Sequence, residues 1–184
     1  MNKKLGLDLD LPPREEGRSL SAAPMDNFLR KAGIPEQHIA GCVEEYEQNF
    51  KVDFPVKPFN GTEECVAALH GTHKLAIVTS NTSANVTAAL GPALADQFAF
   101  ILGIDNGPQS KVESIRLALE QLRVSPQEAC YVGDTKKDHD CAQANGVGFI
   151  AANYGFEDLA ALHLGCPLAN SVSEIPQLLQ IHYS

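Results

Sequence analysis

The sequence predicts an α/β fold in which a parallel β-sheet is covered by helices. From residue 58 onward, short apolar segments alternate with segments that show a helical pattern. The apolar segments are almost uninterrupted, which is typical of parallel strands buried on both faces. Strands that alternate with helices indicate βαβ units and therefore a parallel sheet.

The N-terminal part, residues 1–57, is predicted to be a separate and mainly helical unit. One helix is expected within residues 24–33, and a second follows Pro35 with an apolar stripe at helical spacing. The stripe consists of Ile39, Val43, Tyr46 and Phe50. Before these helices, leucines alternate with glycine and polar residues over residues 5–11, a pattern that suits a half-buried strand. Pro55, Pro58 and Gly61 then mark a linker.

The second unit, residues 58–184, contains the predicted α/β elements in regular order. Strands are expected at residues 74–79, 98–102, 129–132 and 147–151. Helices are expected at residues 62–70, 83–90, 112–122 and 138–144, followed by two short ones at 157–162 and 173–180. These elements predict one sheet with helices on both faces.

The composition limits the kinds of binding partner and indicates the cellular compartment. A chain of 184 residues can form one domain with a sizeable core and a small accessory lobe. Its net charge of −9 argues against nucleic acid or an anionic membrane as partner, and no apolar run is long enough to span a membrane. The five cysteines are scattered without a CxxC pair, which predicts reduced core residues in a cytoplasmic protein.

Two carboxylates follow the predicted strand at residues 129–132. Asp134 comes directly after Gly133, and Asp138 lies four residues further on. Open α/β sheets bind ligands at the carboxyl ends of their strands. Two carboxylates at such an edge, with room for a phosphate, indicate Mg²⁺. The alternative is a solvated turn in which an aspartate caps the next helix.

Two further strand ends carry candidate groups. Thr79, Ser80 and Asn81 offer a hydroxyl and successive backbone N–H groups before a helix, which together suit an anion. The alternative is an ordinary helix cap by Asn81 or Thr82. Lys111 precedes the next helix, where it points a charge into the site or is one more surface lysine.

Taken in order, these residues resemble the motifs of the haloacid dehalogenase-like hydrolase superfamily, on its phosphoglycolate phosphatase-like side. Residues 131–146, YVGDTKKDHDCAQANG, are similar to its fourth motif. Residues 74–81 resemble the second motif and Lys111 the third. Phe59-Asn60-Gly61 resembles the return from the family's cap. The resemblance implies a Rossmann-like parallel sheet, with residues 1–57 as a partial helical cap.

The resemblance also implies a chemistry. In the family an aspartate attacks phosphorus, and a second aspartate acts as acid and base. Mg²⁺ would be held by Asp134. Asp138 would either orient Lys111 or join Asp134 as a ligand that completes the metal shell. The phosphate of a small phosphorylated metabolite would be bound by Thr79, Ser80, Asn81 and Lys111. The catalytic set implied is Thr79, Lys111, Asp134 and Asp138.

The first motif of the family, a buried strand that ends in Asp-x-Asp-Gly-Thr, is not seen. Asp8-Leu9-Asp10 is the Asp-x-Asp near the start, but Leu11-Pro12-Pro13 follows it. We interpret the chain as lacking the nucleophile strand, so that phosphatase activity is impaired. Alternatives are a degenerate motif formed by Asp8 and Asp10, and an inactive relative that acts by binding. A receiver-like signalling module fits the GDxxxD spacing poorly.

A missing first strand has a structural consequence. In the family it lies between the strand that ends at Thr79 and the strand that ends at Val132, so its loss leaves two unpaired edges. We expect the flanking strands to close up, residues 5–11 to fill the gap, or another chain to fill it, as in a homodimer. A stable monomer with an open slot is the least expected outcome, because the cost rivals a domain's total stability of about 5–15 kcal/mol.

Overall fold

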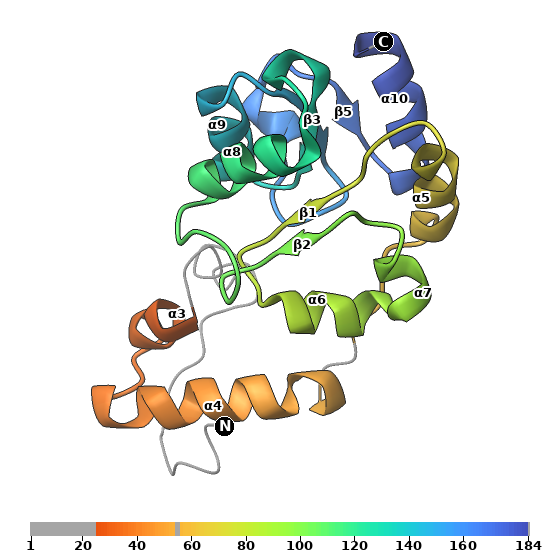
Figure 1. The fold of residues 1–184 in the computed structure, drawn as a ribbon. Helices are drawn as coiled ribbons and strands as arrows, with labels where there is room; N and C mark the ends of the chain where they lie inside the picture. The colour runs from red at the N-terminus through yellow and green to blue at the C-terminus, as the bar shows by residue number, and fades with distance from the viewer. Residues whose placement is uncertain (1–24, 54–55, 184) are drawn as a thin grey trace. The chain divides into compact units, whose positions relative to one another are not determined.

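The computed structural model of the chain describes residues 25–53 and 56–183 (Figure 1). The chain divides into two compact units, residues 1–56 and 57–184. The predicted strand at residues 5–11, with Asp8 and Asp10, lies outside the described residues.

The described part of the first unit is a pair of helices, as predicted. Helices α3 (Met25–Lys31) and α4 (Glu36–Asp53) pack through the buried side chains of Leu29, Ile39 and Cys42. Arg30 donates hydrogen bonds to Asp26 (2.7 Å) and to Glu36 (2.9 Å), which fixes the turn between the helices. That these helices belong to a cap stays a prediction.

The second unit contains the predicted α/β alternation (Figure 1). Its strands are β1 (Ile77–Val78), β2 (Ile101–Leu102), β3 (Cys130–Gly133), β4 (Gly148–Ala152) and β5 (Leu168–Ala169). Its α-helices are α5 (Thr62–His70), α6 (Ser83–Leu90), α7 (Pro92–Ala95), α8 (Lys111–Leu122), α9 (Lys136–Ala144) and α10 (Ile175–His182). Three 3₁₀ turns complete it, η1 (Pro126–Glu128), η2 (Ala160–Leu162) and η3 (Val172–Glu174).

All strand pairs among the described residues are parallel, which confirms the predicted fold class. Strand β1 pairs with β2, with Ile77 opposite Ile101. Strand β4 lies between β3 and β5, with Tyr131 opposite Phe149. The prediction of one sheet is wrong for the described residues, because they form a two-stranded sheet and a separate three-stranded one.

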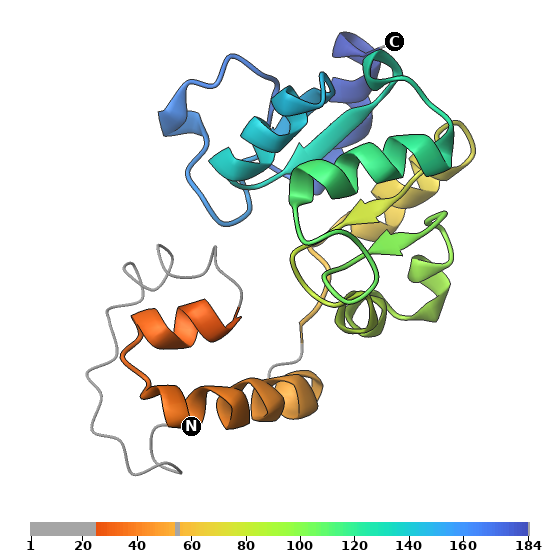
Figure 2. The ribbon, with the colours of Figure 1, turned by 60° about the vertical axis from the view of Figure 1, so that its left-hand side comes forward.

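Helices cover both faces of the three-stranded sheet, which explains its apolar strands. Phe149 and Ile150, adjacent in β4, are both fully buried but belong to different core clusters. Phe149 packs in a cluster with residues of α8 and α9, and Ile150 in one with residues of α5 and α10. Helix α8 also packs against β1 and lies over the interval between β1 and β3 (Figure 2).

The prediction of a helix at residues 157–162 is wrong, since only the 3₁₀ turn η2 forms there. The carboxylate of Glu157 accepts a hydrogen bond from the Lys136 N–H (2.7 Å), and the side chain of Leu159 is buried. These two anchors hold the segment as a loop. Strand β5 was not predicted, because Leu168 and Ala169 stand between Pro167 and Asn170 with no longer apolar run around them.

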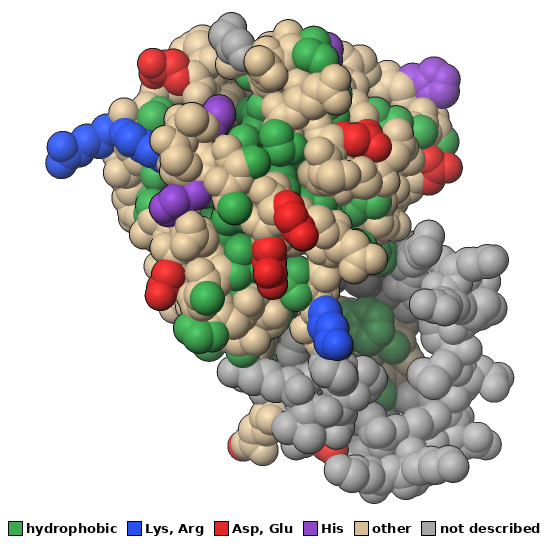
Figure 3. Space-filling model, turned by 90° about the vertical axis from the view of Figure 1, so that its right-hand side faces the viewer, with side chains coloured by type: hydrophobic (Ala, Val, Ile, Leu, Met, Phe, Trp, Pro, Cys, Tyr) green, Lys and Arg blue, Asp and Glu red, His purple; other side chains and the backbone are tan. Residues whose placement is uncertain are grey.

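One face of the second unit carries scattered acidic side chains. On the face of the second unit drawn in Figure 3, acidic side chains lie dispersed among hydrophobic ones. In the part of the chain that the structure describes, no helix combines the length and apolar character needed to cross a membrane.

The core position of Phe149 gives a first testable prediction. We expect Phe149→Ala to lower the free energy of unfolding by about 3–5 kcal/mol, because it removes a buried ring that contacts Tyr131 and His139. Phe59→Ala is the matched control, since Phe59 is 59% exposed. Urea unfolding followed by circular dichroism measures both, and equal losses would contradict the core assignment.

Candidate active site

A buried ion pair joins the carboxyl ends of the two sheets. Lys111, the first residue of α8, places its Nζ 2.5 Å from Asp138 Oδ1 in α9. The Lys111 side chain is 17% exposed and that of Asp138 is 4% exposed. Because Lys111 follows β2 and Asp138 follows β3, the pair brings both strand ends to one edge. Such a pair resists the loss of either partner, since the other would be left buried and charged.

The local sequence fixes the position of Asp138. Its second oxygen, Oδ2, accepts hydrogen bonds from the Thr135 N–H (3.1 Å) and the Thr135 hydroxyl (2.7 Å). The Thr135 hydroxyl in turn accepts from the Asp138 N–H, which completes a capping box at the start of α9. A Cβ at Gly133 would lie 2.4 Å from that of Asp138, so only glycine fits there. Both carboxylate oxygens of Asp138 are thus engaged, in contacts that suit orientation of Lys111.

Asp134 is half-buried directly after β3. Its Oδ2 accepts a hydrogen bond from the Phe156 N–H (3.0 Å). Burial raises the pKa of Asp134 and the charge of Asp138 raises it further, although the Phe156 N–H and Lys111 oppose them. A Cβ at Gly155 would lie 2.3 Å from that of Asp134, so the loop after β4 rests directly on this carboxylate.

Residues after β1 form a tight turn before α6. The Thr79 N–H donates to Leu102 O (2.9 Å), and the Thr79 hydroxyl accepts from the Asn81 N–H (3.0 Å). Of the two predicted caps, Thr82 is the one observed, accepting from the Asn85 N–H at 3.2 Å. The side-chain carbonyl of Asn81 accepts from the Thr82 N–H and the Asn85 amide.

Asp105 was not identified from the sequence, yet it occupies the N-terminus of α6. Its two oxygens accept from the N–H and the hydroxyl of Ser83, each at 2.7 Å. Burial opposes ionisation, but these hydrogen bonds from Ser83 outweigh it and lower the pKa of Asp105. The Ser83 N–H is therefore taken by the chain's own carboxylate, so the Thr79 hydroxyl and Ser80 are the remaining candidates for an incoming anion.

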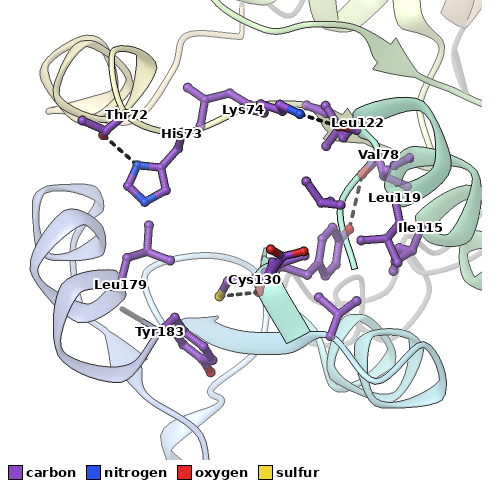
Figure 4. Close-up of a pocket in the computed structure, with 18 residues that line it drawn as sticks. Thr72, His73, Lys74, Val78, Ile115, Leu119, Leu122, Cys130, Leu179 and Tyr183 are labelled. Carbon is purple, nitrogen blue, oxygen red and sulfur yellow. Dashed lines mark hydrogen bonds between the residues drawn. The ribbon is translucent and has the colours of Figure 1, made fainter. Parts of the chain in front are cut away.

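The predicted residues thus fall into two sets. Lys111, Asp134 and Asp138 lie within electrostatic reach of one another. Thr79, Ser80 and Asn81 follow β1, and among the described residues no hydrogen bond links them to that set. The sequence analysis missed Tyr131, whose hydroxyl donates to Val78 O (3.3 Å), one residue before Thr79 (Figure 4). Burial raises the pKa of Tyr131, and the charges of Asp138 and Asp134 raise it further.

Comparison with known proteins identifies the protein family to which the chain belongs. The family model of the haloacid dehalogenase-like hydrolases matches residues 3–152. The chain belongs to this family, which confirms the resemblance seen in its motifs.

The relatives extend the comparison. A phosphoglycolate phosphatase of Chromobacterium violaceum is 29% identical over 143 residues, which cover 75% of this chain and 63% of the relative. One of Nitrosospira multiformis is 30% identical over 167 residues, 88% of this chain and 70% of the relative. The chain thus spans less than two thirds of the first relative's length.

Solved structures show the same fold. A haloacid dehalogenase-like hydrolase from Streptococcus pneumoniae superposes with a TM-score of 0.81 at 22% identity, covering 97% of this chain and 86% of that one. A predicted phosphoglycolate phosphatase from Haemophilus somnus gives 0.84 at 16% identity, covering 97% and 87%. The roles of single residues stay predictions.

The ion pair gives a second prediction. We expect Lys111→Met to lower the free energy of unfolding by about 3–5 kcal/mol, because Asp138 is left as an uncompensated buried carboxylate. Lys136→Met is the matched control, since Lys136 pairs with the exposed Asp140 and such pairs contribute about 0–1 kcal/mol. Adding Asp138→Asn to Lys111→Met should restore part of the loss, and a denaturant series that shows no restoration would contradict the assignment.

The glycine beside Asp138 gives a third prediction. Gly133→Ala should destabilise the protein by about 1–3 kcal/mol, because the new Cβ overlaps Asp138. Gly71→Ala, at a position with nothing within 4 Å of the added Cβ, should change stability little. Thermal melts of the two variants test this, and similar melting temperatures would count against a rigid Gly133–Asp138 contact.

Proposed function

We propose that the carboxyl edge of the two sheets binds Mg²⁺ together with the phosphate of a small phosphorylated metabolite. The reaction supported is the Mg²⁺-dependent phosphatase reaction of the family. The observation that carries the proposal is Lys111, held by Asp138 beside the half-buried Asp134. The relatives that bear the name phosphoglycolate phosphatase support a small phosphate ester as substrate.

The residues present fit Mg²⁺. The ion prefers oxygen ligands and is commonly held by one or two carboxylates, with water and substrate phosphate completing its shell. Asp134 is a suitable ligand, because burial penalises its charge and a cation would compensate it. The described residues hold no cluster of three or more His, Cys, Asp or Glu, so the protein itself would supply few ligands. When bound, the ion would neutralise charge on the phosphate.

Three donor groups can bind phosphoryl oxygens. An ammonium group has three N–H donors, and Lys111 uses one of them on Asp138. The Thr79 hydroxyl accepts from Asn81, so its own hydrogen can still be donated. With the Ser80 backbone N–H, these donors could stabilise the negative charge of a transferred phosphoryl group.

The attacking carboxylate would come from outside the described residues. Asp138 is engaged with Lys111 and Thr135, and Asp134 serves the cation, so neither is placed to attack phosphorus. Asp8 and Asp10 are the candidates that the sequence offers. A second candidate function is an inactive relative that acts by binding, and it is favoured because neither Asp134 nor Asp138 is placed to attack. The five free cysteines support a cytoplasmic location.

Binding and turnover can be tested separately. With p-nitrophenyl phosphate and phosphoglycolate, we expect Mg²⁺-dependent hydrolysis that is lost in Asp8→Asn if Asp8 attacks phosphorus. Calorimetry with Mg²⁺ and inorganic phosphate should show saturable binding to the full chain. Lys111→Met should weaken this binding at least 10-fold, whereas Lys137→Met should not. Binding without turnover would favour the inactive relative, and no binding by folded protein would refute the site.

Asp134 gives a prediction on pH. Because the pKa of Asp134 is raised in the folded protein, ionisation of this carboxyl group lowers the free energy of unfolding. The protein is therefore more stable at low pH, and it loses this stability as pH rises through the raised pKa. Without Mg²⁺, Asp134→Asn should therefore raise the melting temperature at pH 7, with the gain shrinking toward pH 4. Mg²⁺ should stabilise only the wild type. Asp140→Asn is the control of opposite sign, because Lys136 lowers the pKa of Asp140.

A further inference from the structure

The loop that follows β2 is joined by hydrogen bonds to the turn that follows β1. The Ile104 N–H donates a hydrogen bond to Asn81 O (3.1 Å). One residue further on, the carboxylate of Asp105 accepts from both the N–H and the hydroxyl of Ser83, each at 2.7 Å. These bonds span the carboxyl ends of β1 and β2, which are neighbours in the two-stranded sheet.

The loop is also held by hydrogen bonds within itself. The Asn106 side chain accepts from the Gly103 N–H (2.8 Å) and donates to Ile101 O (3.0 Å). A Cβ at Gly103 would lie 2.5 Å from Asp105 Oδ1 and 2.5 Å from Ser83 N, so a side chain there would push the carboxylate away from the turn. The loop therefore presents Asp105 to Ser83 in a fixed position.

The turn carries two of the three donor groups proposed above for phosphate. The Thr79 hydroxyl accepts from the Asn81 N–H (3.0 Å), which orients it and leaves its hydrogen for a ligand. The Ser80 N–H lies between these two residues in the chain. Asn81 thus connects the donors to the loop, because its N–H contacts Thr79 and its carbonyl accepts from Ile104. A shift of Asn81 would move both donors.

The same loop leads to the third donor. Lys111 begins α8 at the end of the segment that starts with Gly103. The Ser114 hydroxyl donates to Pro108 O (3.2 Å), which joins the segment to the first turn of α8. Residues 103–111 therefore hold the turn at one end and supply the ammonium group at the other, so that the relative position of the donors depends on this segment.

Capping of α6 does not by itself account for Asp105. The Thr82 side chain already caps the helix by accepting from the Asn85 N–H (3.2 Å). A carboxylate close to a phosphate site carries a charge of the same sign as the ligand, which opposes binding. The contribution of Asp105 that Thr82 cannot supply is the bridge from the loop to Ser83.

We propose that Asp105 is a positioning residue for phosphate, which acts through Ser83 to keep the Thr79 hydroxyl and the Ser80 N–H in the orientation that phosphate requires. This inference rests on the phosphate site proposed above. Donors that are already ordered bind an anion more tightly than mobile ones, because no further ordering is needed on binding. The bridge carries the effect, since the charge of Asp105 alone would repel phosphate.

Two substitutions separate the bridge from the charge. Asp105→Ala removes both hydrogen bonds to Ser83. Asp105→Asn can keep them, because an amide oxygen can accept from the Ser83 N–H and an amide NH₂ can donate to the Ser83 hydroxyl. By calorimetry with inorganic phosphate and Mg²⁺, we expect Asp105→Ala to raise the Kd at least 10-fold and Asp105→Asn to stay within about 3-fold of the wild type. Equal weakening by both would overturn the bridging role.

Glu128→Ala is the matched control for a loss of stability. Glu128 accepts from the N–H (2.9 Å) and the hydroxyl (2.7 Å) of Ser125, the same pair of donor groups, but it precedes β3 and so lies at the amino end of that strand. Both alanine variants should lower the melting temperature, and only Asp105→Ala should weaken phosphate binding. An unchanged Kd in Asp105→Ala would overturn the positioning role alone. Absence of phosphate binding by the folded wild type would overturn the phosphate site and the positioning role together.

Ser83→Ala keeps the proposal testable should Asp105→Ala fold poorly. It removes one of the two hydrogen bonds to Asp105 and should raise the Kd for phosphate by about 3-fold. Amide hydrogen exchange measured by NMR without phosphate should become faster at Ser80 and Asn81 in this variant. An unchanged Kd together with unchanged exchange at these two amides would overturn the proposal.

Discussion

The buried pair of Lys111 and Asp138 is the constraint on which the second unit depends. It ties α8, which follows the two-stranded sheet, to α9, which follows the three-stranded one. Among the described residues, one weaker hydrogen bond from Tyr131 to Val78 also spans the slot between the sheets. Both side chains are largely buried, and the loss of either would leave the other as a buried, unpaired charge, so the pair holds both strand ends at one edge. The candidate site is built on that edge.

Three glycines make room for acidic side chains in the second unit. Gly133 lies against Asp138, Gly155 against Asp134 and Gly103 against Asp105, each with no space for a Cβ. The contacts let backbone and carboxylate approach closely, so each acidic side chain is held by main chain as well as by its hydrogen-bond donors. A rigid set of carboxylates keeps its geometry when a phosphate or a cation enters, which lowers the cost of ordering the site on binding.

Local patterns predicted what depends on neighbours in sequence. Helices α5 and α6 have the predicted bounds, because a 3.6-residue period and a cap such as Thr82 are contained within each segment. Gly133, Asp134 and Asp138 were singled out by their spacing, and Lys111 by its place in the ordered set of family motifs. Asp105 and Tyr131 were missed, since their partners Ser83 and Val78 lie 22 and 53 residues away. Nothing in a single sequence indicates such pairs.

Among the described residues the interval between β1 and β3 is open, which is the state that the sequence analysis expected least. Unpaired strand edges favour a segment that can satisfy their backbone groups. A parallel strand in the slot would end at the edge where Lys111 and Asp134 lie, since β1 and β3 both end there. Its last residues would then line the candidate phosphate site. Occupation of the slot and chemistry at the edge are therefore coupled by geometry, because whatever completes the sheet also completes the wall of the site.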